Sequence, residues 1–176
     1  MTVMNTPFLP LAALFLVCLA VRDSYELLKE SGRITAGNKP AFITVFLAMG
    51  ALWTSWFLLC PEDPYRLGLS TVVQWAGQLI TLAGTILAVG ALIQLRGLEG
   101  IDHLVTRGFF KRLRHPMYLG FMLWIIGWSL AHDAAAALAL GVPALASILW
   151  WRHLEDRRLT AQFGDAYGTY KQSTWF

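Results

Sequence analysis

The residues best suited to chemistry lie in one basic stretch, residues 103–120, which runs straight into an apolar segment. Its strongly basic side chains are Arg107, Lys111, Arg112 and Arg114. His115 precedes Pro116, which disfavours the helical conformation at His115 and makes Pro116 a natural first residue of a helix. The free N–H groups and the positive dipole end of that helix suit a carboxylate or phosphate. The stretch therefore predicts an anion-binding site where water meets the membrane, although basic loops also flank membrane helices for topological reasons alone.

The composition is that of an integral membrane protein. Of the 176 residues, 56% are hydrophobic and 14% are charged, whereas a soluble domain has about 25% charged residues. The net charge of +3 could indicate a nucleic-acid partner, but the basic residues lie between apolar runs and form no continuous stripe. We therefore predict no nucleic-acid partner, contact with membrane lipids, and one membrane domain over residues 1–176.

Five apolar runs predict an all-α fold, since a membrane helix needs about 20 residues. We place these runs at residues 7–28, 40–59, 69–95, 116–131 and 134–151. At about 1.5 Å per residue the fourth run covers only roughly 24 Å, which is less than the thickness of the hydrocarbon layer. We expect the fourth and fifth runs to form a tight helical hairpin, and this hairpin either barely crosses the bilayer or stops within its far leaflet. Pro143 is expected to kink the fifth run. A polar tail, residues 152–176, would begin with a short helix along the interface.

The lysine and arginine residues predict the orientation of these spans. They gather in the connector after the first run, in residues 96–115 and in the tail, whereas the other two loops hold only Arg66. Basic loops remain in the cytoplasm, so the N-terminus is expected outside and the C-terminus inside, across a bacterial-type inner membrane. Residues 96–115 and the tail then face the same side and can share one site.

Two further expectations concern processing and metals. No positive charge precedes the first run and no convincing cleavage site follows it, so we interpret the run as a mature spanning helix. Cys18 and Cys60 lie at or within apolar runs, which argues against a disulfide framework. His103 and His115 are far apart in sequence and lack the cysteine partners usual for zinc, so we predict no metal.

The second half of the chain carries three motifs in a fixed order. They are His103-Leu-Val-Thr-x-Gly, then Arg114-His-Pro-Met-Tyr-x-Gly120, and, after the apolar hairpin, Glu155-x-x-x-Leu159-x-x-x-Phe163-Gly-x-x-Tyr167-x-x-Tyr170. Together they resemble the isoprenylcysteine carboxyl methyltransferase and phospholipid methyltransferase superfamily. The resemblance covers residues 95–170, and the first two apolar runs resemble nothing that we can assign.

This resemblance implies an integral membrane methyltransferase that uses S-adenosylmethionine and releases S-adenosylhomocysteine. Residues 96–115 would be its cytoplasmic cofactor loop. The implied cofactor-binding residues are His103, Leu104, Val105, Arg114, His115, Tyr118 and Glu155. In this interpretation Arg114 and the start of the helix neutralise the methionine carboxylate, and Glu155 binds the ammonium. Aromatic or carbonyl groups near Tyr118 face the sulfonium. Tyr118 and Glu155 are also the candidate catalytic residues, because an amine acceptor must lose a proton.

The methyl acceptor is less defined. The resemblance implies a lipophilic small molecule or lipid, methylated on oxygen, nitrogen or sulfur. Gly108-Phe109-Phe110 stands where many relatives have Gly-Pro-Tyr or Gly-Ile-Tyr. The last residues of the tail also lack the proline-containing sequence associated with prenylcysteine enzymes. Two other functions stay open: an NADPH-dependent membrane reductase of the sterol-reductase type, and a non-catalytic protein that binds lipid or a partner helix.

The candidate residues also have structural interpretations. Glu155 could simply pair with Arg158 one helical turn later. Tyr118 could be an aromatic residue of the membrane interface, and His103 could cap a loop. His132 and Asp133, which join the last two apolar runs, are expected at the far side and outside the catalytic set.

Overall fold

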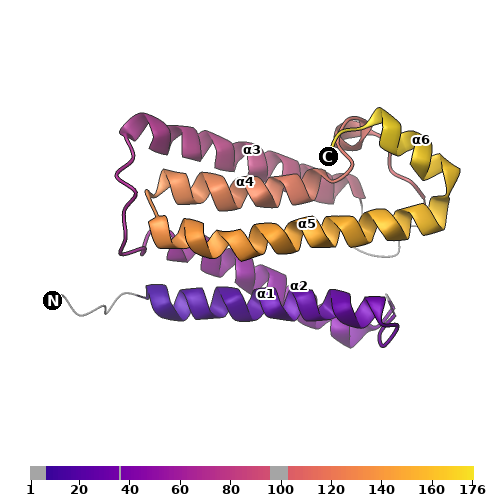
Figure 1. Cartoon of the computed structure of the whole chain (residues 1–176), viewed down its shortest axis with the longest axis horizontal. Helices are drawn as coiled ribbons and strands as arrows, with labels where there is room; N and C mark the ends of the chain where they lie inside the picture. The colour runs from indigo at the N-terminus through magenta and orange to yellow at the C-terminus, as the bar shows by residue number, and fades with distance from the viewer. Residues whose placement is uncertain (1–6, 36, 96–102) are drawn as a thin grey trace.

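The computed structural model describes residues 7–35, 37–95 and 103–176 as a bundle of long helices. These are α1 (Phe8–Glu30), α2 (Lys39–Leu59), α3 (Thr71–Leu95), α4 (Pro116–Ala131) and α5 (Ala135–Phe163), with a short 3₁₀ helix η1 (Gly108–Lys111) and a final helix α6 (Asp165–Ser173). Figure 1 shows the start of α1 at one end of the bundle and α6 at the other, with the C-terminus folded back from α6 toward α4. The predicted all-α membrane fold is confirmed. By length and composition, α1, α2, α3 and α5 can each cross a membrane, and α4 is a shorter apolar helix.

The first four predicted runs agree with the observed helices within two residues. Local chemistry explains two of the helix starts. Pro116 begins α4, and the Asn38 side chain caps α2 by accepting a hydrogen bond from the Ala41 N–H at 3.1 Å. Both features are strong signals for the beginning of a helix.

The fifth run was predicted too short. Instead of ending near Trp151, α5 continues as one 29-residue helix to Phe163, with Pro143 inside it. The residues after Trp151 include good helix formers such as leucine, glutamate, arginine and glutamine. The helix ends only at Gly164, which has a φ of +53°, and the separate short helix is α6. The change in polarity therefore marks where α5 leaves its apolar surroundings and not where it stops.

The central helix is α4, which lies between α3 and α5 in Figure 1. Its closest packing is against α3, where glycines let the two backbones approach. A Cβ atom on Gly120 would lie 2.6 Å from the Gly84 carbonyl oxygen and 2.8 Å from the Ala88 backbone nitrogen. No real side chain tolerates such distances to backbone atoms, so these positions require glycine.

Substitution of Gly120 by leucine should push α3 and α4 apart. We expect a loss of stability of about 1–3 kcal/mol, the usual range for overpacking a close interface. A thiol-reactive dye can follow thermal unfolding, because Cys18 and Cys60 are both free and buried. Gly50→Leu is the matched control, since nothing lies within 4 Å of a Cβ atom there. Equal melting temperatures for the two variants would contradict the predicted close approach.

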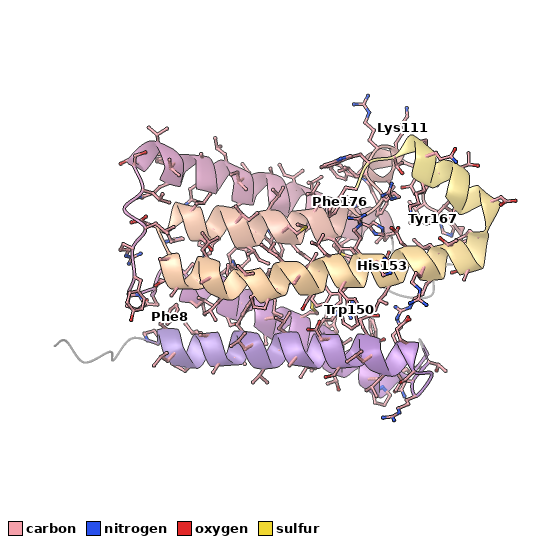
Figure 2. The ribbon with its side chains drawn as sticks, in the orientation of Figure 1. Phe8, Lys111, Trp150, His153, Tyr167 and Phe176 are labelled. Carbon is pink, nitrogen blue, oxygen red and sulfur yellow. The ribbon has the colours of Figure 1, made fainter. Side chains whose placement is uncertain are left out.

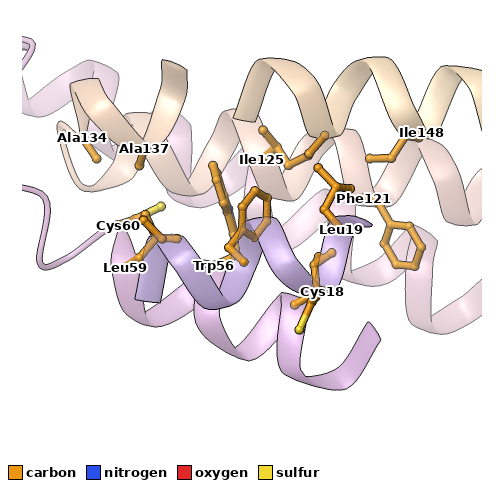
Figure 3. Close-up of a cluster of buried hydrophobic side chains, with 14 of the residues drawn as sticks. Cys18, Leu19, Trp56, Leu59, Cys60, Phe121, Ile125, Ala134, Ala137 and Ile148 are labelled. Carbon is orange, nitrogen blue, oxygen red and sulfur yellow. The ribbon is translucent and has the colours of Figure 1, made fainter. Parts of the chain in front are cut away.

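The apolar core lies where α1, α2, α4 and α5 meet. Figure 3 shows Trp56 and Ile125 at its centre, and both are fully buried. The indole N–H groups of Trp56 and Trp128 donate to the carbonyls of Trp124 and Phe57 at 3.4 and 2.9 Å. These bonds satisfy polar atoms that lipid could not and fix α4 against α2.

Two aspartates tie together the end of the bundle away from α6. The Asp63 side chain, in a residue that is 1% exposed, accepts hydrogen bonds from the Ala137 N–H at 2.7 Å and caps α5. Asp133 accepts from the Leu69 N–H at 2.9 Å, and Arg66 donates to the His132 carbonyl at 2.6 Å. Asp133 and the His132 backbone therefore anchor loops at this end of the bundle.

Candidate functional site

Asp156, near the polar end of α5, is the centre of a buried cluster at the opposite end of the bundle. Its carboxylate lies 2.8 Å from Nε2 of His115, the residue directly before α4. It also accepts a hydrogen bond from the hydroxyl of Tyr167 in α6. Nε of Arg114 and Nζ of Lys171 lie 4.0 and 3.8 Å from its two oxygens. One carboxylate thus joins α5, α6 and the entrance to α4, and Figure 2 shows Tyr167 between α6 and α5.

The hydrogen bonds at Asp156 determine which ring nitrogen of His115 is free. Burial, with the hydrogen bond to Asp156 and its negative charge, raises the pKa of Tyr167 well above its usual value. Tyr167 is therefore a neutral donor at physiological pH. An ionised carboxylate only accepts hydrogen bonds, so Nε2 of His115 must carry a hydrogen. In the neutral ring Nδ1 is then the acceptor, and it lies 3.9 Å from Oε1 of Glu155.

Glu155 is the more accessible member of the acidic pair. Its side chain is 44% exposed, against 10% for that of Asp156. Tyr118 stacks on the His115 ring at a centroid distance of 5.7 Å. Arg158 binds two glutamates of α1 instead of Glu155. Glu155, Tyr118 and Nδ1 of His115 therefore form one polar cluster.

Arg114 holds the C-terminal tail. Its guanidinium donates to the carbonyls of Lys171 and Thr174 at 3.1 and 2.9 Å. Its backbone N–H and that of His115 approach the Phe176 oxygen at 3.2 Å, and Figure 2 shows Phe176 lying back toward α4 and α5. Several of the donors that the sequence suggested for a ligand carboxylate are thus occupied by the chain itself, whereas the buried Nε of Arg114 has no hydrogen-bond partner among the described residues. The proximity of Arg114 to the cluster was predicted, but this partner was not.

Tyr170 supports the same region from α6. Its hydroxyl donates to the Phe110 carbonyl at 2.6 Å, and burial raises its pKa to about 12.

We expect Tyr170→Phe to lower stability by about 1 kcal/mol at neutral pH, the usual net value of one hydrogen bond. Because the pKa rises on folding from about 10 to about 12, this contribution is fully present below pH 10. It is lost as the pH rises from about 10 to about 12. Melting temperatures of the two proteins measured from pH 8 upward should converge above pH 10. Parallel curves would show that the Tyr170 hydroxyl does not titrate in this way.

The remaining predicted residues, His103, Leu104 and Val105, lie on the segment that leads into η1, which contacts α6 through the Phe110 carbonyl and the Tyr170 hydroxyl. His103 is exposed, and Leu104 and Val105 are half-buried. Residues 96–102 of the predicted cofactor loop lie outside the described residues. Among the part of the chain that is described, no group of three His, Cys, Asp or Glu side chains could hold a metal ion.

An open pocket of about 480 Å³ lies beside η1. It combines apolar and cationic side chains, and its lining residues are Gly108, Phe109, Lys111, Arg112, Leu113 and Trp175.

Comparison with known proteins assigns the chain to a family. Residues 71–166 match the family model described as phospholipid methyltransferase, which is more than half of the chain. The chain belongs to the phospholipid methyltransferase family. The resemblance inferred from the motifs is confirmed, and the match begins earlier than the motifs did, because it includes α3.

Three similar proteins are methyltransferases by name. Methanethiol S-methyltransferase of Pseudomonas sp. (strain GM41(2012)) is 29% identical over 122 residues, which are 63% of this chain and 45% of that protein. Methanethiol S-methyltransferase of Pseudomonas deceptionensis is 28% identical over 140 residues, 73% and 53% of the two chains. Protein-S-isoprenylcysteine O-methyltransferase of Schizosaccharomyces pombe is 31% identical over 78 residues, 40% and 31%. The chain thus spans about a third to a half of the length of these relatives. No solved structure matches it.

Asp156 and Tyr167 were missing from the predicted site of this family member. The sequence showed Asp156 only as one more polar residue after Trp151, and Tyr167 only as part of a motif. The single usable signal was an acidic pair, Glu155-Asp156, in an otherwise basic segment. Adjacent residues on a helix point about 100° apart, so one of the pair can bury its side chain while its neighbour stays accessible.

Proposed function

We propose that this integral membrane protein is a methyltransferase that transfers a methyl group from S-adenosylmethionine to a lipophilic acceptor. The observation that carries the proposal is the 2.8 Å contact between His115 and Asp156. It joins the Arg-His-Pro segment before α4 to the polar end of α5, within a chain of the phospholipid methyltransferase family. The names of the relatives, which mention a small thiol and an isoprenylcysteine, support the reaction class.

The cluster fits the cationic groups of such a donor. Oε1 of Glu155 and Nδ1 of His115 are two acceptors only 3.9 Å apart, an unfavourable pair unless a donor hydrogen lies between them or the imidazole is charged. The ammonium of the methionine portion is such a donor. We assign its binding to Glu155 and His115, and the face toward the sulfonium to Tyr118. Arg114, which is engaged by the tail, supports this site indirectly. Lys111 and Arg112 supply positive charge for the carboxylate of the ligand's methionine portion.

When bound, S-adenosylmethionine supplies a methyl group activated by the positive sulfur. The chain's own contribution is to bring a water-soluble donor and a membrane-borne acceptor together and to exclude water. A carboxylate or thiolate acceptor carries its own electron pair and needs no base. An amine must lose one proton, and the exposed carboxylate of Glu155 is the best-placed group to take it, with Tyr118 as the second candidate.

The donor is made in the cytoplasm, so the proposed orientation has the C-terminus and the site on that side and the N-terminus outside, in a bacterial-type inner membrane. The acceptor would reach the site laterally from the lipid.

The experiment that tests this function uses the purified protein in detergent with methyl-labelled S-adenosylmethionine. The acceptor panel contains a prenyl thiol, a prenylcysteine carboxylate, a small thiol and a phospholipid amine. We expect label transfer to one class and binding of S-adenosylhomocysteine by isothermal titration. Folded protein that binds NADPH but neither of these compounds would instead be a reductase. Folded protein that binds no cofactor would be a non-catalytic member of the family.

A further inference from the structure

The polar end of α1 is joined to the polar end of α5 by a set of ion pairs that we call the Arg158 clasp. It consists of Arg158 in α5 with Glu26 and Glu30 in α1. Nη1 of Arg158 lies 2.7 Å from Oε2 of Glu26, and Nη2 lies 2.7 Å from Oε1 of Glu30. The Arg158 Nε also donates to Glu30 at 3.0 Å. All three nitrogen atoms of one guanidinium thus contact glutamates of α1, a geometry that lysine cannot reproduce.

The clasp continues a row of charged residues that α1 turns toward α5. Glu26 is only 4% exposed and has a second cation, Arg22, as a partner. The Arg22 guanidinium lies 4.6 Å from the centre of the Trp151 ring. Asp23 accepts hydrogen bonds from the Trp151 indole at 2.7 Å and from a serine of α5 at 2.9 Å. Buried ionisable residues at this depth are costly, so their retention requires a specific reason.

The position of Arg158 in the sequence suggests that reason. It follows Glu155 and Asp156 on the section of α5 beyond the apolar run. In that section Leu154 is the one buried apolar residue, so its rotation about the helix axis depends mainly on the polar contacts of Asp156 and Arg158. The clasp supplies a fixed point on α1 within one helical turn of Glu155. A shift of about 1 Å in a positioned group can cost roughly 100-fold in rate, so such a fixed point has a functional consequence.

We propose that Glu26 and Glu30 are positioning residues of the methyl-transfer site, which act through Arg158 to set the orientation of Glu155 and Asp156. The proposal rests on the function proposed above. It gives α1 a role in the site, although α1 lies outside residues 71–166, which the family model matches.

The test replaces Arg158 with glutamine. Glu26 keeps its Arg22 partner in this variant, so the protein should still fold. We expect binding of S-adenosylhomocysteine to weaken by roughly tenfold and the KM for the methyl donor to rise by a similar factor, as for the loss of a supporting contact. Arg158→Lys, which keeps one ion pair, should restore part of the affinity. Arg157→Gln is the matched control, because it removes the same charge from a side chain that is 66% exposed and 3.8 Å from Glu30.

The outcomes separate the two proposals. Wild-type protein that binds no S-adenosylhomocysteine would overturn the proposed function itself. If the wild-type protein binds it and Arg158→Gln melts at a lower temperature with unchanged affinity, the clasp only stabilises the fold and our inference is wrong. Glu30→Gln, at the more exposed side of the clasp, repeats the measurement with a milder change. Its effect should disappear when Arg158 is already glutamine, and two additive effects would also contradict the inference.

Discussion

Replacing Glu155 with alanine should abolish binding of S-adenosylhomocysteine while leaving the protein folded in the membrane. The side chain is 44% exposed, and its ion-pair contact with His115 is 3.9 Å long, so its loss removes little that holds the fold together. In the proposed site the Glu155 carboxylate accepts a hydrogen bond from the ammonium of the ligand. A hydrogen bond to a charged group is worth up to about 3 kcal/mol, or roughly 100-fold in affinity.

Isothermal titration measures this affinity directly. Glu62→Ala is the control, because Glu62 is also exposed but lies in the loop between α2 and α3, at the far end of the bundle. Both variants should melt at the wild-type temperature. Unchanged affinity in Glu155→Ala would remove Glu155 from the site.

Replacing the neighbouring Asp156 with asparagine should reduce both stability and ligand binding. The substitution keeps the shape of the side chain but removes the negative charge that His115 and Tyr167 face. Both groups contact Oδ1, so the amide oxygen of asparagine can still accept from them, but the amide nitrogen then replaces Oδ2, which lies 3.8 Å from Nζ of Lys171. A hydrogen bond to a charged acceptor is stronger than one to a neutral acceptor, so we expect a loss of about 1–3 kcal/mol.

The thiol-dye melting assay should therefore show a lower melting temperature for Asp156→Asn. S-adenosylhomocysteine binding should weaken even below the melting temperature, since a weaker hydrogen bond then holds the His115 ring. Asp165→Asn, an exposed aspartate at the start of α6, serves as the control and should change little. A wild-type melting temperature for Asp156→Asn would mean that Asp156 is not the centre of the cluster.

Together, these two variants test whether the adjacent residues Glu155 and Asp156 have different roles, one in ligand binding and the other in both stability and ligand binding. Glu155 is predicted to affect the ligand alone, whereas Asp156 is predicted to affect the fold and the ligand. No property of the two side chains in isolation distinguishes them, because both are carboxylates on the same turn of α5. The difference arises from the neighbours that α4 and α6 provide.

Predictions based on local chemistry succeeded for most of the fold. Long apolar runs identify membrane helices because lipid offers no partners for backbone groups. Pro116 marks the start of α4 because the first residue of a helix makes no intrahelical hydrogen bond through its N–H, so the N–H that proline lacks is not needed there. The end of α5 was wrong for a related reason. Polarity reports the surroundings of a segment, whereas helix formation in residues 152–163 depends on propensity, which stays favourable until Gly164.

The sequence by itself determined the membrane class, the starts of the long helices and the family. Only the tertiary structure decided the partners: Asp156 with His115 and Tyr167, Arg114 with the tail, and Arg158 with α1. The physical reason is range. Helix starts and membrane spans depend on neighbours a few residues away. The hydrogen bonds of Asp156 to Tyr167 and His115 and of Arg158 to Glu30 join residues 11, 41 and 128 positions apart and depend on how whole helices pack.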